Sequence, residues 1–290
     1  MAASGAPPPV RFERACALRD ALFPPDHSSA PERRLLDAVL ARFAHDRLHF
    51  SDILEWSLSE DERGVDMARF SYAFPGFVRA REDVTRTALA WADGLGAGAS
   101  RAARSVLRAA RSPTVEQILL GYARGTGDGP ARAKFYLQFR DGAGPSALEL
   151  ARALLGTPRP TTSDRLPLHL LGLDVGPEGL AGAKLYFAHV GDPATIEGFS
   201  GPVHNALWIH RLRHPDDPAF ETPGEIDFAL VGSTWDALAS SPALAPHAAA
   251  RVAFEDLGGS FRLRARRASL ALRGAPKLNL YYVLDERGAT

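Results

Sequence analysis

The chain has 290 residues, of which 46% are hydrophobic and 23% are charged, a composition typical of a soluble globular protein. Basic and acidic residues number 34 each, and this zero net charge argues against a nucleic acid or an anionic membrane surface as a partner bound by bulk electrostatics. The single cysteine, Cys16, excludes an internal disulfide, and no Cys/His set has zinc-ligand spacing.

The N-terminal segment 1–9 is rich in Ala and Pro and lacks the basic and apolar regions of a secretory signal peptide. We expect a disordered tail there, followed by a single domain over residues 10–290. No run of 18 apolar residues is available to span a membrane. We therefore expect a cytoplasmic protein, and the sequence carries no signal for an oligomeric state.

Hydrophobic periodicity predicts helices and strands in chain order. The expected helices are 11–22, 31–44, 78–92, 101–111, 146–155 and 234–255. The expected strands are 48–59, 65–74, 115–122, 131–139, 166–174, 181–189, 206–212, 224–231, 261–272 and 276–284. The ten strands form five pairs, each preceded by helical sequence. Helix 146–155 is expected to open on a capping box, Ser146-x-x-Glu149, and to end before Gly156.

The predicted strands have one apolar and one polar face. In 48–59 the even positions, such as Leu54 and Trp56, are apolar, whereas odd positions such as Glu55 are polar. Helices need an apolar sheet face to cover, so the polar faces would line an interior, and closing the sheet also removes its edges. We predict an α+β fold: a ten-stranded antiparallel β-barrel with a solvated lumen, surrounded by α-helices in five ααββ repeats.

Only three of the 34 basic residues are lysines, and each lies two residues before a Tyr or Asn in a strand-like run. One internal repeat is visible, because Leu119-Leu120-Gly121-Tyr122 with Lys134-Phe135-Tyr136 parallels Leu170-Leu171-Gly172-Leu173 with Lys184-Leu185-Tyr186. Cations and tyrosines around a lone carboxylate would suit a polyanionic ligand beside a carbocation. The residues expected to face the lumen are Glu55, Arg69, Arg132, Lys134, Tyr136, Gln138, Lys184, Tyr186, Lys277, Asn279 and Tyr281.

Several of these runs resemble motifs of aromatic prenyltransferases of the dimethylallyltryptophan synthase type, in the ABBA superfamily. Residues 51–58, SDILEWSL, resemble the first-strand Pro/Leu-x-Glu-x-Ser motif, and residues 68–72, ARFSY, resemble the Val-Arg-Phe/Tyr-x-Phe segment of the next strand. The two Lys-x-Tyr runs and the last strand, residues 277–282, resemble further motifs. The resemblance covers roughly residues 30–285, and the family fold is a ten-stranded barrel ringed by five helix pairs.

The resemblance implies transfer of a dimethylallyl or longer prenyl group from its diphosphate to an indole or tryptophan-like acceptor, by electrophilic aromatic substitution in secondary metabolism such as alkaloid biosynthesis. It implies that Glu55 accepts a hydrogen bond from the indole N–H. It further implies that the diphosphate is bound by Arg69, Lys134, Tyr136, Lys184, Tyr186, Lys277 and Tyr281. Asp216-Asp217 lacks the Asp-Asp-x-x-Asp spacing of metal-dependent prenyl synthases, so we expect no requirement for Mg²⁺ or another cofactor.

Two strands depart from the family pattern. Gly182 stands where one motif carries an arginine, and Glu225-x-Asp227 replaces a Gln-x-Tyr, which favours a cationic or hydroxyl-bearing acceptor. The candidate acceptor contacts are Trp208 and His210, expected on the lumen side, together with Glu225 and Asp227. All three lysines already have roles, so no residue is assigned as the final proton acceptor. The arginines within residues 262–267 fit a lumen face and a solvated strand end equally well.

Two alternatives stay open. The acceptor could be a phenol, a naphthalene or a peptide. The chain could also be a non-catalytic barrel that binds an anionic aromatic metabolite.

Overall fold

The computed structural model describes residues 10–24, 30–45, 54–94, 99–123, 132–156, 167–176, 178–190, 194–212, 224–272 and 274–285. Its helices are α1 (Val10–Leu22), α2 (Ala30–His45), α3 (Arg81–Asp93), α4 (Ala99–Ala110), α5 (Gly144–Leu155), α6 (Thr234–Ala239), the 3₁₀ helix η1 (Pro242–His247) and α7 (Ala248–Phe261). Its strands are β1 (Leu54–Asp61), β2 (Gly64–Ala73), β3 (Val115–Ala123), β4 (Arg132–Phe139), β5 (Leu168–Gly176), β6 (Gly179–Ala188), β7 (His204–Leu212), β8 (Glu225–Ala229), β9 (Leu263–Ala271) and β10 (Leu278–Leu284). The predicted tail and the first part of the first predicted strand, 48–53, lie outside the described residues.

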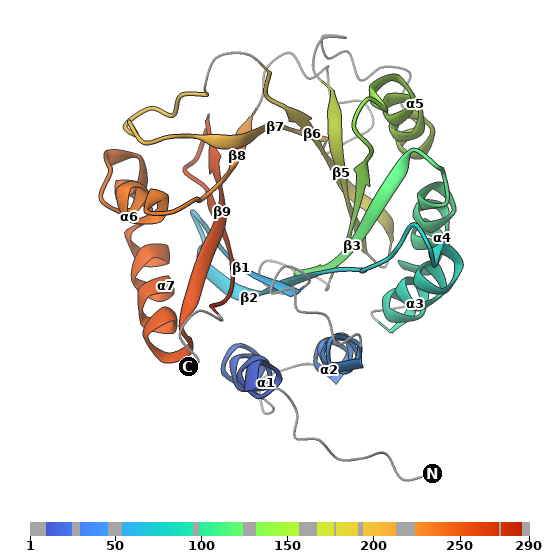
Figure 1. Ribbon diagram of the computed structural model, residues 1–290, viewed down its shortest axis with the longest axis horizontal. Helices are drawn as coiled ribbons and strands as arrows, with labels where there is room; N and C mark the ends of the chain where they lie inside the picture. The colour runs from blue at the N-terminus through green and yellow to red at the C-terminus, as the bar shows by residue number, and fades with distance from the viewer. Residues whose placement is uncertain are drawn as a thin grey trace.

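The ten strands form one closed barrel in which every neighbouring pair is antiparallel (Figure 1). Consecutive strands are neighbours throughout, and the barrel closes where β1 pairs with β10, with Trp56 opposite Tyr282. Closure leaves no strand with an unpaired edge. The predicted ten-stranded antiparallel barrel is confirmed, and the predicted strand ends agree with the observed ones to within a few residues along most of the chain.

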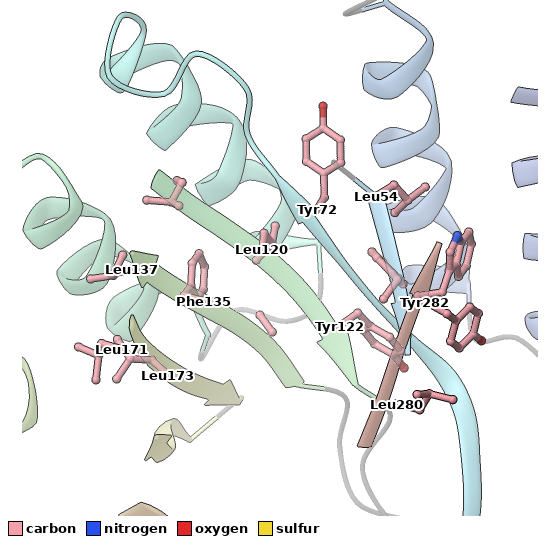
Figure 2. Packing of buried hydrophobic residues seen from close by; sticks show 14 of the residues in the cluster. Leu54, Tyr72, Leu120, Tyr122, Phe135, Leu137, Leu171, Leu173, Leu280 and Tyr282 are labelled. Atoms are coloured by element: carbon pink, nitrogen blue, oxygen red, sulfur yellow. The ribbon is translucent and has the colours of Figure 1, made fainter. Parts of the chain in front are cut away.

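The apolar face of the barrel points outward. Trp56 and Leu58 of β1 and Phe70 and Tyr72 of β2 are buried. Figure 1 shows the helices outside the ring of strands, and Figure 2 shows buried side chains of neighbouring strands, such as Phe135, on the side toward the helices. Burying a large apolar side chain contributes about 1.5–3 kcal/mol, so this outer layer supplies much of the stability of the fold.

The predicted helix pair before every strand pair is only partly found. Two helices precede β1 and two precede β3, α6 and α7 with η1 precede β9, and α5 is the described helix before β5. Before β7, the described residues hold a short bridge between Ile196 and Phe199 in place of helices, so the prediction is wrong there. Phe199 stacks on Phe228 of β8 with ring centroids 6.4 Å apart. This segment therefore covers the outer face of β8.

Two helix boundaries differ from the predicted ones. Helix α5 begins at Gly144 with Pro145 in its first turn, so Ser146 is not its cap and the predicted capping box is wrong. Proline has a preformed helical φ angle and needs no N–H at this position, which explains the earlier start. The predicted end is confirmed, because Gly156 is left-handed with φ 67° and donates to the carbonyl of Arg152.

The predicted helix 234–255 is divided into α6, η1 and α7, because the prolines at 242 and 246 interrupt helical hydrogen bonding. None of the described helices combines the length and the apolar character needed to cross a membrane.

Candidate active site

The repeat seen in the sequence places a glycine opposite a lysine in two neighbouring hairpins. Gly121 of β3 pairs with Lys134 of β4, and Gly172 of β5 pairs with Lys184 of β6. A Cβ on Gly121 would lie 3.0 Å from the Phe70 carbonyl oxygen, and one on Gly172 would lie 3.1 Å from the Tyr136 ring. Side chains at these two positions would occupy the space that the lysines and tyrosines use. The prediction of two hairpins with one architecture is confirmed.

The polar face of the barrel lines an internal cavity of about 190 Å³. Most of the residues that line it are of polar type, because each strand that alternates its side chains turns its polar set inward. The polar residues that line it come from eight strands: Glu55, Ser57, Arg69, Ser71, Lys134, Tyr136, Gln138, His169, Tyr186, Asp227, Arg267 and Tyr281. The cavity therefore brings together Glu55, five residues expected at the diphosphate, and Asp227.

Carboxylates face the cations of the lumen, which we define as the space enclosed by the barrel. The Lys134 ammonium donates to Asp174 Oδ1 at 2.8 Å, and Lys184 Nζ lies 3.4 Å from Glu225 Oε2. The Arg267 guanidinium donates from Nε to Asp227 Oδ1 at 2.5 Å. The expectation of a lone carboxylate is therefore wrong. Buried charges need partners because solvation by water is lost, and these pairs supply them.

Arg69 differs from the other cations because its described partner is neutral. Its Nη1 donates to the Asn279 Oδ1 atom at 3.0 Å, across the closure between β1 and β10. An amide carries no net charge, and the guanidinium also acts at longer range on the Asp174 carboxylate, whose pKa Lys134 and Arg69 lower against the effect of burial. Arg69 therefore keeps more capacity for an anionic ligand than a cation bonded to a carboxylate.

The tyrosines form an aromatic wall of the same cavity. The rings of Tyr136 and Tyr186 meet edge to face with centroids 6.4 Å apart, on either side of Gly172. Burial raises the pKa of Tyr136, Tyr186 and Tyr281. Their hydroxyls therefore stay protonated at neutral pH and can donate hydrogen bonds, while their π faces can stabilise a cation.

Glu55 projects from β1 into the cavity, with Ser71 opposite it on β2. Burial raises the pKa of Glu55 from 4.5 to about 7, against the opposing effects of Arg266 and Arg267. A carboxyl group with a pKa near neutrality exchanges a proton readily, which suits a hydrogen-bond acceptor or an acid–base group. The side chain stands within the same enclosed space as Arg69 and Lys134.

Two of the residues expected at the acceptor do not face the lumen. Trp208 and His210 lie on the outer face of β7, because Leu207 lines the cavity and neighbouring side chains alternate. Trp208 Nε1 donates to His189 Nδ1 at 2.8 Å, and His210 packs edge to face on Phe187. Their expected position on the lumen side is therefore wrong. Lys277 precedes β10 and Arg132 is exposed; neither is among the described residues that line the cavity.

Lys184 and Glu225 lie on the inward faces of β6 and β8 and contact each other, but they are also absent from the described lining of the cavity. These two residues therefore reach a ligand in this cavity only if side chains rearrange.

The sequence interpretation missed Asp174 and His169, and it left the face of Arg267 undecided. A β-bulge between β9 and β10 sets Arg267 opposite Tyr281 and then Ala265 opposite Tyr282, so simple alternation along 262–267 fails. Asp174 lies opposite Lys134, and no local pattern reveals this pairing of distant strands. Burial, with Arg267 nearby, lowers the pKa of His169, which keeps its imidazole neutral.

No protein-family model matches the chain, and no curated protein matches it either. Among the described residues, no group of three His, Cys, Asp or Glu side chains is arranged to hold a metal ion. Asp216 and Asp217 lie outside the described residues. The assignment of this site therefore rests on its geometry and electrostatics.

The raised pKa of Glu55 predicts a pH-dependent stability. The folded state keeps the Glu55 proton up to about pH 7, whereas the unfolded chain loses it near pH 4.5, so stability falls as pH rises between these values. Glu55→Gln removes this dependence and should gain about 3 kcal/mol relative to the wild type across that range. Urea unfolding at several pH values measures the difference. Glu149→Gln on the exposed face of α5 should parallel the wild type; parallel curves for Glu55→Gln would contradict the assignment.

Proposed function

We propose that this chain is an aromatic prenyltransferase. It transfers a dimethylallyl or longer prenyl group from the prenyl diphosphate to an indole or tryptophan-like acceptor. The observation that carries the proposal is the convergence of Glu55, Arg69 and Lys134 with three tyrosines on one cavity inside a closed barrel. The reaction needs all three kinds of group: cations for the leaving diphosphate, aromatic faces for the allylic cation, and a carboxylate for the acceptor. The polar lining also supports a solvated lumen.

Arg69 and Lys134 are the residues that bind the diphosphate in this proposal. Arg69 offers a guanidinium whose described partner is an amide, and Lys134 exchanges the Asp174 oxygen for a phosphate oxygen. Charge-assisted hydrogen bonds of this kind strengthen as negative charge develops on the leaving group. Tyr136, Tyr186 and Tyr281 add hydroxyl donors. These contacts lower the barrier to breaking the allylic C–O bond.

The acceptor ring lies on the Glu55 side of the cavity. With a pKa of about 7, Glu55 is partly ionised at neutral pH, and its ionised form accepts a hydrogen bond from the ring N–H. This bond raises the electron density of the ring and stabilises the arenium cation that forms. The tyrosine faces hold the allylic cation until a ring carbon or nitrogen attacks it. Enclosure in the barrel protects this cation from bulk water.

Among acceptors, the charges favour one with a cationic or hydroxyl group. Besides Glu55, the buried carboxylate of Asp227 lines the cavity, and Asp174 lies next to it at Lys134. These groups suit the ammonium group of a tryptophan-like acceptor and equally the hydroxyl of a phenol or naphthalene. A peptide acceptor needs an opening wide enough for its backbone.

A non-catalytic barrel that binds an anionic aromatic metabolite is the second candidate. Two observations favour it: Lys134 and Arg267 already have carboxylate partners, and a cavity of about 190 Å³ suits one small ligand better than two substrates. Binding both substrates requires side chains along the lumen to rearrange.

Product formation separates the two candidates. Purified protein mixed with dimethylallyl diphosphate and tryptophan should give a product heavier by one prenyl unit, detected by mass spectrometry. A panel of indoles, phenols and naphthalenes then ranks the acceptors. Retention of an aromatic anion without any new product, over the whole panel, would support the binding protein and overturn the enzyme.

Substitution of Arg69 and Lys134, the two cationic residues proposed to bind the diphosphate, tests the site itself. Arg69→Ala and Lys134→Ala should each lower turnover at least about 100-fold, since one such contact contributes about 3 kcal/mol to transition-state stabilisation. Arg104→Ala, on the exposed face of α4, removes an arginine far from the lumen and should leave turnover unchanged. Initial rates of prenyl transfer measure all three variants, and equal effects would refute the assignment.

A further inference from the structure

Asp227 is a buried carboxylate that reaches the cavity on the side proposed for the acceptor, and no proton transfer has yet been assigned to it. The residue belongs to β8 and is 4% exposed, and its side chain lines the cavity together with Glu55. These two are the carboxylates among the described lining residues. Strands β8, β9, β10 and β1 are consecutive neighbours in the barrel, so Asp227, Arg267, Tyr281 and Glu55 share one wall.

Arg267 fixes the position and the charge of Asp227. The guanidinium donates from Nε to Asp227 Oδ1, and its Nη2 donates to the Asn205 carbonyl oxygen at 3.1 Å. A guanidinium stays protonated at any physiological pH, so this pair favours the ionised carboxylate. The second carboxylate oxygen has no described partner at hydrogen-bond distance. Burial nevertheless raises the pKa of Asp227 against the opposing effect of Arg267, so this carboxylate is a stronger base than an exposed aspartate.

The reaction proposed above must dispose of one proton. When the ring carbon forms its new C–C bond and diphosphate leaves with the electron pair of the C–O bond, the arenium carbon still carries its hydrogen. Aromaticity returns when that C–H bond breaks, its electron pair re-enters the ring, and a base takes the proton. Because an arenium ion is a very strong acid, a positioned carboxylate is basic enough for this step.

We propose that Asp227 is the base that removes the ring proton from the prenylated arenium ion. This inference rests on the proposed prenyltransferase function and assigns the proton acceptor of that reaction. Asp227 receives the proton at a carboxylate oxygen and returns it to solvent after the product leaves. Arg267 acts through Asp227 as a positioning residue.

The other groups that line the cavity fit this step less well. Glu55 holds the ring N–H, and Lys134 is bonded through its ammonium protons to Asp174. The tyrosine hydroxyls are protonated donors. His169 lies on β5, and burial together with the Arg267 charge lowers its pKa, which makes it a weaker base than an ordinary histidine.

Asp227→Asn tests the assignment with dimethylallyl diphosphate and tryptophan as substrates. Turnover should fall at least about 100-fold, the usual contribution of a positioned base. Deprotonation then becomes slow, so tryptophan deuterated on its indole carbons should show a primary isotope effect that the wild type lacks. The dissociation constant of the Asp227→Asn variant for inorganic diphosphate should equal that of the wild type, because Asp227 does not bind the diphosphate. Asp66→Asn, a matched change on β2, should keep wild-type turnover and show no isotope effect.

A double variant separates a base from a structural partner. If Asp227 only neutralises Arg267, then Asp227→Asn with Arg267→Met removes both charges and should restore turnover. The proposal predicts that turnover stays low in this variant, which also avoids an unpaired buried guanidinium and so protects the fold. Circular dichroism melting checks that both variants are folded.

Three results would overturn the inference: wild-type turnover in Asp227→Asn, lost turnover without an isotope effect, or recovery in the double variant. Each leaves the proposed function standing, because the wild type still makes product. A wild type without product on the whole acceptor panel is a distinct failure, which removes the proposed function and this inference together.

Discussion

The closure of the sheet with its polar face inward is the constraint on which the rest of the molecule depends. Helices and the segment before β7 bury the outer apolar faces of the strands, so the inward faces are free to carry charge. Pairing between β1 and β10 joins Glu55 and Arg69 near the start of the chain to Tyr281 near its end. Without this closure, the candidate site would be divided between two sheet edges.

Enclosure also explains why the lumen contains nearly as many acids as bases. A buried charge without a partner would cost several kcal/mol. In the described part of the lumen, three cations have carboxylate partners, in the pairs Lys134–Asp174, Lys184–Glu225 and Arg267–Asp227. An anionic ligand must therefore replace a carboxylate that already occupies its cation. Affinity for a diphosphate becomes a difference between two strong interactions, and the amide-bonded Arg69 provides the least opposed contact.

The sequence was sufficient to predict the inward face of a strand where polar and apolar residues alternate along it. The inward faces of β1 and β2 could be predicted from polar Glu55 and Arg69 among apolar neighbours. The repeated Gly and Lys positions identified the hairpins β3–β4 and β5–β6. It was insufficient in β7, where Leu207, Trp208 and Ile209 are all apolar and the inward face cannot be chosen by pattern. The face of Arg267 stayed undecided because a bulge interrupts alternation along its strand, and Asp174 was missed because its partner lies on another strand.

The central claim is that Arg69 and Lys134 act together inside one closed cylinder on a prenyl diphosphate. A crystal structure with the unreactive thiolodiphosphate analogue of dimethylallyl diphosphate tests it most directly. The account predicts phosphate oxygens against both cations, Asp174 displaced from Lys134, and the prenyl chain against the Tyr136 and Tyr186 rings. An analogue bound on the outer surface, or an empty lumen at saturating concentration, would contradict it.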